Sequence, residues 1–208
     1  GERNDIRIIE VFRHGFLINL INGLLLVGVV YSARNVLYFI NQPPEVVSLS
    51  IPYLTIIASS LIPLLVFQTF KQFTEGLSNT RVAMIIIIAS NVVNIFLNYI
   101  LIFGHAGFPA MGLVGAGWAT LLSRIFMALS FATYLYYAPA FRKFRNGFSL
   151  GKYSSSLVAK MLHLGIPSGV QFIFEVAAFD FSLVMMGWLG TLTQAAHQIA
   201  INLATISY

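Results

Sequence analysis

Charged residues are scarce in this chain of 208 residues: Asp, Glu, Lys and Arg together make up 9% of it, whereas hydrophobic residues make up 58%. Ordinary soluble domains carry about 25% charged residues. So few charges cannot cover a surface that faces water, and a disordered chain needs high charge with low hydrophobicity. The composition therefore excludes a disordered chain, argues against a soluble globular domain and predicts an integral membrane protein.

Cysteine is absent from the chain. Its absence excludes disulfide bonds, thiolate metal sites and a cysteine nucleophile. The sequence also contains no His-Glu-x-x-His motif, no Gly-x-Ser-x-Gly motif and no phosphate-binding loop. We therefore expect neither an enzyme nor a bound cofactor. An intramembrane enzyme stays an alternative only if helices outside this chain supply a nucleophile or metal ligands.

Long apolar stretches dominate the chain. A helix needs about 20 predominantly apolar residues to cross a bilayer, whereas a spanning strand needs about 10 residues that alternate in polarity. The stretches in this chain are too long for strands and do not alternate, so they predict an all-α polytopic membrane protein. They cover residues 16–40, 51–70, 82–103, 112–138, 162–189 and, as a shorter run, 194–208.

The connection at residues 139–160 is longer than the others and basic. It is the one place where a boundary between two helical bundles can fall. We therefore expect four spans within residues 1–138, and the first helix and part of the second helix of another bundle within residues 161–208. The chain starts with Gly1 rather than Met and stops inside an apolar run, so we expect it to be a piece of a longer protein.

Basic residues outside the spans lie on alternate connections. The net charge is +5, from 12 Lys and Arg against 7 Asp and Glu. In a membrane protein this excess indicates orientation rather than nucleic-acid binding. Residues 1–15, the turn around Gly76 and the 139–160 connection hold the basic residues outside the spans, and the connections between them hold none. The positive-inside rule therefore places residues 1–15 and 139–160 in the cytoplasm.

Two acidic residues lie inside the fifth stretch. An ionisable group at membrane depth is costly and by default marks a functional site. Glu175 lies near the middle of the stretch and is a candidate site for a proton or Na⁺, and Asp180 follows within two helical turns. The alternative is a protonated Glu175 that only hydrogen-bonds a neighbouring helix. Pro167 removes a backbone donor before Glu175 and predicts a bend in the helix.

The third stretch carries three asparagines. Asn91, Asn94 and Asn98 are spaced three and four residues apart, so they share one helix face. Their amides can coordinate a cation or a substrate hydroxyl, or they can hydrogen-bond neighbouring helices. The spacing alone leaves both interpretations open.

The fourth stretch begins with small residues at 112–120, which predict close packing against another helix. Within this stretch, Thr120 can offer a hydroxyl to the asparagine face. Arg124 lies inside the bundle and needs a carboxylate or several carbonyls as partners. It therefore either contacts substrate or forms a structural ion pair. Further candidates for lining a cavity are Gln171, His197 and Asn202.

Five segments resemble, in the order of the chain, segments of the multidrug and toxic compound extrusion (MATE) transporters of the bacterial NorM-like kind. They are FKQFTEGLSNT at 70–80, VNIFLNYILIFG at 93–104, GLVGAGWAT at 112–120, GIPS with FEV within 165–176, and AAHQIAIN at 195–202. The resemblance implies a fold of twelve helices in two six-helix bundles. This chain then holds about helix three to the start of helix eight.

The resemblance also implies a function: a secondary active efflux transporter in the bacterial plasma membrane that exports organic cations and drugs in exchange for Na⁺ or H⁺. It implies a monomer in membrane lipid, with small organic cations and no nucleic acid as partners, and no cofactor besides the coupling ion. A lipid-linked saccharide flippase of the same superfamily is the alternative, which a cluster of cationic residues in the cavity would favour.

Several residues match positions with a role in that family. Glu175 matches the acid of the cation site in the second bundle, and Asp180 matches a second acid that some members have. Asn94, Asn98 and Thr120 match first-bundle polar residues that act with an Asp on helix one, outside this chain. Some members have an acid at the position of Asn98, and this chain differs from them there.

Overall fold

The computed structural model describes residues 2–40, 44–139, 141, 153–188, 190 and 196–202. Within these residues, five helices are long and apolar enough to cross a membrane. The structure therefore confirms the all-α polytopic membrane class. The candidate spans are Ile6–Val36, Val46–Gly76, Arg81–Phe103, Gly112–Tyr137 and Ser155–Leu183.

The helices divide into two compact units, Gly1–Tyr153 and Ser154–Tyr208. The boundary falls inside the connection that the sequence analysis places at residues 139–160. Helix α6 starts at Ser155, so the last residues of that predicted connection, Lys160 among them, are helical. The first unit holds α1 (Glu2–Ala33), the 3₁₀ helix η1 (Arg34–Ile40), α2 (Pro44–Ser59), α3 (Leu61–Gly76), α4 (Arg81–Phe103) and α5 (Gly112–Tyr137).

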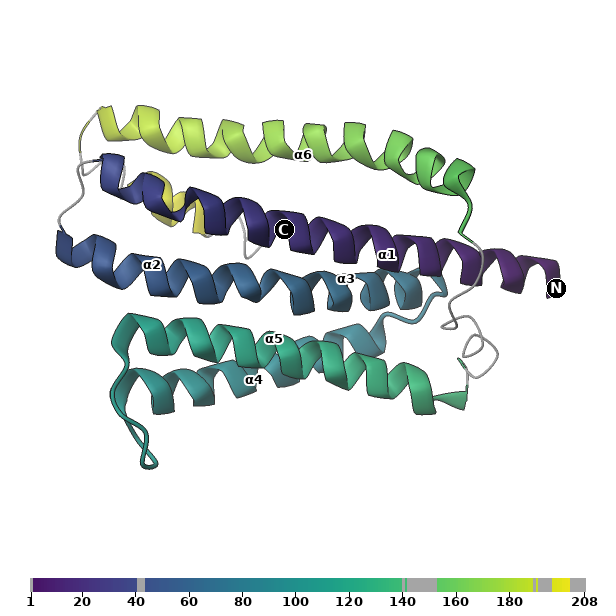
Figure 1. The fold of residues 1–208 in the computed structure, drawn as a ribbon, viewed down its shortest axis with the longest axis horizontal. Helices are drawn as coiled ribbons and strands as arrows, with labels where there is room; N and C mark the ends of the chain where they lie inside the picture. Colours follow the sequence, from purple (N-terminus) through teal and green to yellow (C-terminus); the bar gives the residue numbers. More distant parts are fainter. Residues whose placement is uncertain are drawn as a thin grey trace. The chain divides into compact units, whose positions relative to one another are not determined.

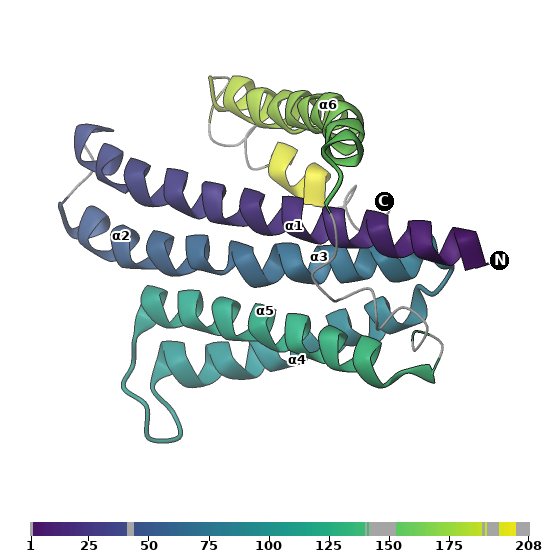
Figure 2. The same ribbon diagram turned by 45° about the vertical axis from the view of Figure 1, so that its right-hand side comes forward.

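The helices of the first unit run alongside one another in two layers (Figures 1 and 2). One layer holds α1 together with α2 and α3, which follow each other in line, and the other layer holds α4 and α5. Helix α5 connects the layers because it packs against α2 and α3 as well as against α4. Polar side chains of α5 can therefore reach both layers.

The hydrogen-bond pattern of the second span has a local break at Ser60, which keeps helical backbone angles, within the stretch predicted as one helix over residues 51–70. Helix α2 ends at Ser59 and α3 begins at Leu61. Pro63 has no backbone N–H, so it cannot bond the carbonyl of Ser59 in the usual i to i−4 pattern. The backbone N–H of Ser60 instead lies 3.1 Å from the carbonyl oxygens of both Ile56 and Ile57, which is a locally tightened turn.

The close packing predicted for the start of the fourth stretch is confirmed. Gly115 on α5 lies so near α4 that a Cβ atom there would overlap the carbonyl oxygen of Leu101. Two residues further on, a Cβ at Gly117 would lie 3.3 Å from the Tyr53 ring of α2. Glycine at these two positions lets α5 approach α4 and α2 closely.

Aromatic rings form the core at one end of the first unit. Phe131 of α5 is 0% exposed, and its ring centroid lies 5.5 Å from that of Phe67 and 6.2 Å from that of Phe70. Phe141, just after α5, is buried with its ring centroid 6.0 Å from that of Phe73. The start of the connection after α5 is thereby attached to the first unit.

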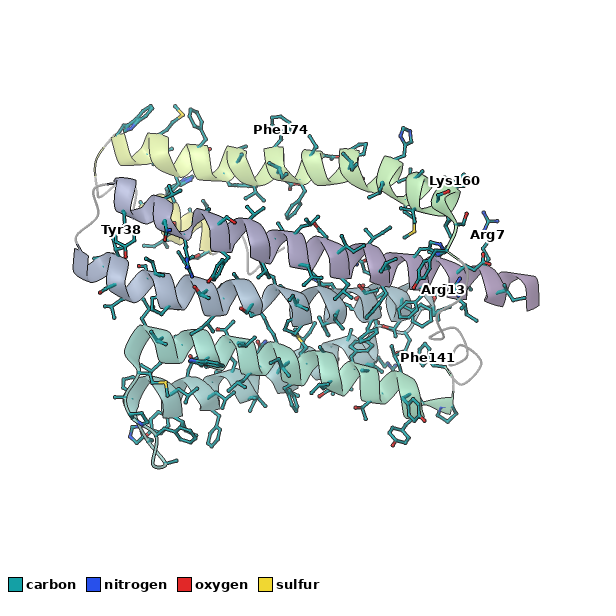
Figure 3. All side chains as sticks on the ribbon, viewed as in Figure 1. Arg7, Arg13, Tyr38, Phe141, Lys160 and Phe174 are labelled. Atoms are coloured by element: carbon teal, nitrogen blue, oxygen red, sulfur yellow. The ribbon has the colours of Figure 1, made fainter. Side chains whose placement is uncertain are left out.

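The basic residues of α1 lie at this same end of the unit. Figure 3 shows Arg7, Arg13 and Phe141 at the end opposite Tyr38. The turn between α3 and α4 lies there too (Figure 1). Arg7 and Arg13 of α1, Phe141 and the turn between α3 and α4 therefore lie at one end of the first unit, and the side of the membrane that this end faces stays a prediction.

The second unit is described at α6 (Ser155–Trp188) and at residues 196–202, which are also helical. The remainder of the run predicted at 194–208 lies outside the described residues. Helix α6 continues through Pro167. Ser168 donates a hydrogen bond from its hydroxyl to the Leu164 carbonyl at 3.0 Å, while the bend expected at Pro167 stays a prediction.

Candidate functional site

A chain of hydrogen-bonded polar side chains joins α4 to α5. Asn98 donates from Nδ2 to Oδ1 of Asn94 at 2.9 Å, and Asn94 donates from Nδ2 to Oγ of Ser123 at 3.2 Å. Ser123 in turn donates from Oγ to the carbonyl oxygen of Thr120 at 3.0 Å. The two asparagines thus share one helix face as predicted, and their hydrogen bonds are directed along the helix face and across to α5.

Two buried serines belong to this network of hydrogen bonds, and the sequence analysis missed them. Ser123 is 4% exposed and Ser90 is 6% exposed, and Ser90 donates from Oγ to the carbonyl oxygen of Ser123 at 3.0 Å. The signal was available, because Ser90, Asn94 and Asn98 follow one another at intervals of four residues on α4. Serine is common in membrane helices, so the spacing was the only clue.

The hydroxyl expected to face the asparagines belongs to a different residue. Thr120 donates from Oγ1 to the carbonyl oxygen of Ala116 in its own helix at 2.9 Å. Ser123, three residues later, contacts Asn94 instead. The hydroxyl that contacts the asparagine face is therefore that of Ser123, while the role of Thr120 in lining a cavity stays a prediction. Thr120 takes part through its carbonyl.

Arg124 reaches away from the asparagines toward α2 and α3. Its Nη1 atom donates to Oγ of Ser60 at 2.5 Å. Ser60 is fully buried at the break between the two helices. Among the residues that the structure describes, no carboxylate forms an ion pair with Arg124, and the ion pair in these ranges joins Lys71 and Glu75 at the end of α3.

The predicted acidic site belongs to the second unit. Glu175 and Gln171 lie on α6 one turn apart, and both side chains are exposed. Glu175 lies within the candidate span Ser155–Leu183, and α6 begins before the predicted residue 162. Asp180 is part of α6, but its side chain lies outside the described residues. His197 is half-buried and Asn202 is exposed on the helical segment 196–202.

Among the described residues, no group of three or more His, Cys, Asp or Glu side chains is placed to hold a metal ion. The hydrogen-bonded amide face of Asn94 and Asn98 and the guanidinium of Arg124 in the first unit, and the carboxylate of Glu175 in the second unit, are polar groups within candidate spans. They define a polytopic helical membrane protein whose spans carry polar groups.

Comparison with known sequences identifies the family. The family model described as MatE matches residues 1–100 of the chain. The chain is 32% identical over 208 residues to the probable multidrug resistance protein NorM of Rhizobium meliloti, covering 100% of this chain and 44% of that protein. It is 32% identical over 198 residues to the multidrug resistance protein NorM of Photobacterium profundum, covering 94% of this chain and 43% of that protein.

A third relative, the probable multidrug resistance protein NorM of Oceanobacillus iheyensis, is 31% identical over 209 residues, with 100% of this chain and 47% of that protein covered. The chain therefore spans less than half the length of these relatives. The chain belongs to the MATE family, a family of transporters, and it is a multi-pass protein of the bacterial plasma membrane. The resemblance found in the sequence is confirmed.

Proposed function

We propose that the full-length protein is a secondary active efflux transporter that exports organic cations, drugs among them, in exchange for Na⁺ or H⁺. The observation that carries the proposal is the similarity of the whole chain to multidrug resistance proteins of the NorM kind. The polar groups inside its apolar spans support it, since polar residues at membrane depth are costly and are retained where they bind a solute or an ion.

Glu175 is the residue that we assign to ion coupling. Its carboxylate lies on a membrane-spanning helix, where its charge is stable only with a bound cation or proton. Among the described residues, no basic side chain forms an ion pair with it. A coupling ion and a cationic substrate can therefore compete for the same negative charge, which is what exchange requires.

The amide face of α4, formed by Asn94 and Asn98, is assigned to the wall of the substrate pathway in the first unit. Asn94 and Asn98 offer neutral donors and acceptors that hydrogen-bond a polar substrate without adding a charge of their own. Ser123 accepts a hydrogen bond from the Asn94 amide, and Ser90 donates to the Ser123 carbonyl, so both serines link α4 to α5 beside the amides. Alternating access follows if the two bundles of the full-length protein rock about such a central site.

The test is efflux of a fluorescent organic cation from vesicles that contain the full-length protein, driven by an imposed Na⁺ or H⁺ gradient. We expect Glu175→Gln to abolish gradient-driven efflux, because the amide cannot bind and release the coupling ion. The matched control is Glu75→Gln, the same substitution at the end of α3, where Glu75 pairs with Lys71 at 3.8 Å on the surface. This control is expected to change efflux by less than about twofold.

Gradient-driven efflux that survives Glu175→Gln at the wild-type rate would refute the coupling role of Glu175. Absence of efflux by the wild-type protein under both gradients would refute the transport function itself. Comparing the two gradients in the wild-type protein identifies the coupling ion.

A further inference from the structure

Arg124 is a charged residue in the middle of a membrane span. It lies halfway along α5, whose candidate span is Gly112–Tyr137, and its partner Ser60 lies halfway along the span Val46–Gly76. A guanidinium at this depth is costly unless an opposite charge accompanies it. The neutral hydroxyl of Ser60 supplies a hydrogen bond but no charge.

The surroundings of Arg124 orient the guanidinium without neutralising it. Ser60 donates its own proton from Oγ to the Ile57 carbonyl at 2.6 Å, so its oxygen accepts the hydrogen bond from Nη1 of Arg124. The Ser60 hydroxyl carries no charge, and it lies between α2 and α3.

Most of the hydrogen-bonding capacity of Arg124 is unused by the residues that the structure describes. A guanidinium carries five N–H donors in a planar fork, and the contact with Ser60 uses one of them. The side chain is only partly buried. Two parallel N–H donors match the two oxygens of a carboxylate, a geometry that favours bidentate binding.

We propose that Arg124 is a carboxylate-binding site at mid-span, and that it selects substrates which carry a free carboxylate beside their cationic group. The inference rests on the proposed efflux function and deepens it by naming a substrate class. Ser60 acts as a positioning residue because it holds one edge of the guanidinium. An acidic side chain elsewhere in the full-length protein offers the same chemistry, so the test distinguishes the two sources of the carboxylate.

The experiment measures equilibrium binding of two matched dyes to the purified full-length protein in lipid nanodiscs by fluorescence anisotropy. One dye is a rhodamine with a free carboxylate, and the other is its methyl ester, which is a pure cation. We expect Arg124→Gln to weaken binding of the free acid about tenfold or more and to leave binding of the ester within about twofold, since a charge-assisted bidentate contact is lost only for the acid.

Three further variants sharpen the result. Arg124→Lys keeps the charge but loses the fork, so the free acid is expected to bind with an affinity between those of the wild type and Arg124→Gln. Ser60→Ala is expected to weaken binding of the free-acid dye by about threefold, since it removes the hydrogen bond that orients the guanidinium. Arg34→Gln is the matched control, because the guanidinium carbon of Arg34 lies 3.9 Å from the centroid of the Tyr31 ring at the far end of α1, away from the break. This variant should leave the binding affinity of both dyes unchanged.

Thermal unfolding of the same samples separates the possible outcomes. If Arg124→Gln lowers the melting temperature, Arg124→Lys restores it and neither dye changes affinity, the carboxylate comes from the protein itself and the substrate selection is refuted. If neither dye affinity nor melting temperature changes, the carboxylate site as a whole is refuted. Neither result depends on transport, which the Glu175→Gln efflux assay tests separately.

Discussion

Helices α5 and α6 are similar in composition but differ in their surroundings. Their candidate spans have equal mean hydropathy, yet one third of the α5 span is buried inside the structure and none of the α6 span is. Helix α5 places glycine, alanine and serine against its neighbours, whereas α6 exposes large side chains such as Phe172 and Phe174. The capacity to span a membrane is therefore a matter of composition, and burial is a matter of which helices are adjacent.

The difference follows from how membrane helices associate. Lipid tails are as apolar as leucine, so apolar surface alone does not drive one helix against another. Close packing, small residues and interhelical hydrogen bonds do so instead. Helix α5 has all three through Gly115, Phe131 and Ser123. Three matched pairs of substitutions in the 208-residue chain, one member on α5 and the other on α6, test this account.

The largest difference is expected between Phe131→Ala and Phe174→Ala. Phe131 is 0% exposed among other rings, whereas Phe174 is 72% exposed. We expect Phe131→Ala to lower the free energy of unfolding by about 3–5 kcal/mol, because it leaves a cavity, and Phe174→Ala to change it by less than about 0.5 kcal/mol. Unfolding in detergent micelles by added SDS, followed by far-UV circular dichroism, measures both. Equal losses would contradict the proposed contrast.

The next pair is Gly115→Ala and Gly169→Ala. The new methyl group at Gly115 would overlap the Leu101 carbonyl oxygen of α4, whereas nothing lies within 4 Å of a Cβ at Gly169. Gly115→Ala is expected to cost about 1–3 kcal/mol through overpacking. Gly169→Ala is expected to be neutral or to stabilise α6 by up to about 1 kcal/mol, because alanine favours a helix. A stabilised Gly115→Ala in the same unfolding assay would show that α4 and α5 are not in tight contact.

The smallest difference is expected between Ser123→Ala and Ser182→Ala. Ser123 is buried and accepts a hydrogen bond from Asn94 of another helix, whereas Ser182 donates only to the Ala178 carbonyl of its own helix at 2.8 Å. Ser123→Ala should cost about 1 kcal/mol, since it leaves the Asn94 amide without this acceptor, and Ser182→Ala should cost less than about 0.5 kcal/mol. Repeating both in an Asn94→Ala background provides the control, because the cost of Ser123→Ala should then shrink.

Much of the fold could be predicted from local sequence. The third and fourth stretches, placed at residues 82–103 and 112–138, correspond closely to α4 (Arg81–Phe103) and α5 (Gly112–Tyr137), because turn residues bound them on both sides. Helices α1 and α6 begin at Glu2 and Ser155, before the apolar stretches at residues 16–40 and 162–189. Polar and charged residues there continue the helices past their apolar parts, and an apolar window cannot detect that continuation.

The candidate site could be predicted only in part. Asn94 and Asn98 were found because their spacing along one helix is visible in the sequence. Their contact with Ser123, rather than with the Thr120 hydroxyl, depends on how α5 is rotated about its axis against α4. A shift of one residue on a helix turns a side chain by about 100°, so the choice between two hydroxyls three residues apart needs the packed helices.

The sequence by itself determined that this protein lies in a membrane, that it is helical and to which family it belongs, because the cost of burying each side chain in lipid depends on that residue alone and adds along a span. Only the tertiary structure decided that Ser60 interrupts the second span beside Arg124 and that Ser90 and Ser123 hold the asparagine face. These contacts join residues far apart in the chain, and they exist only because α5 packs against both layers of the first unit.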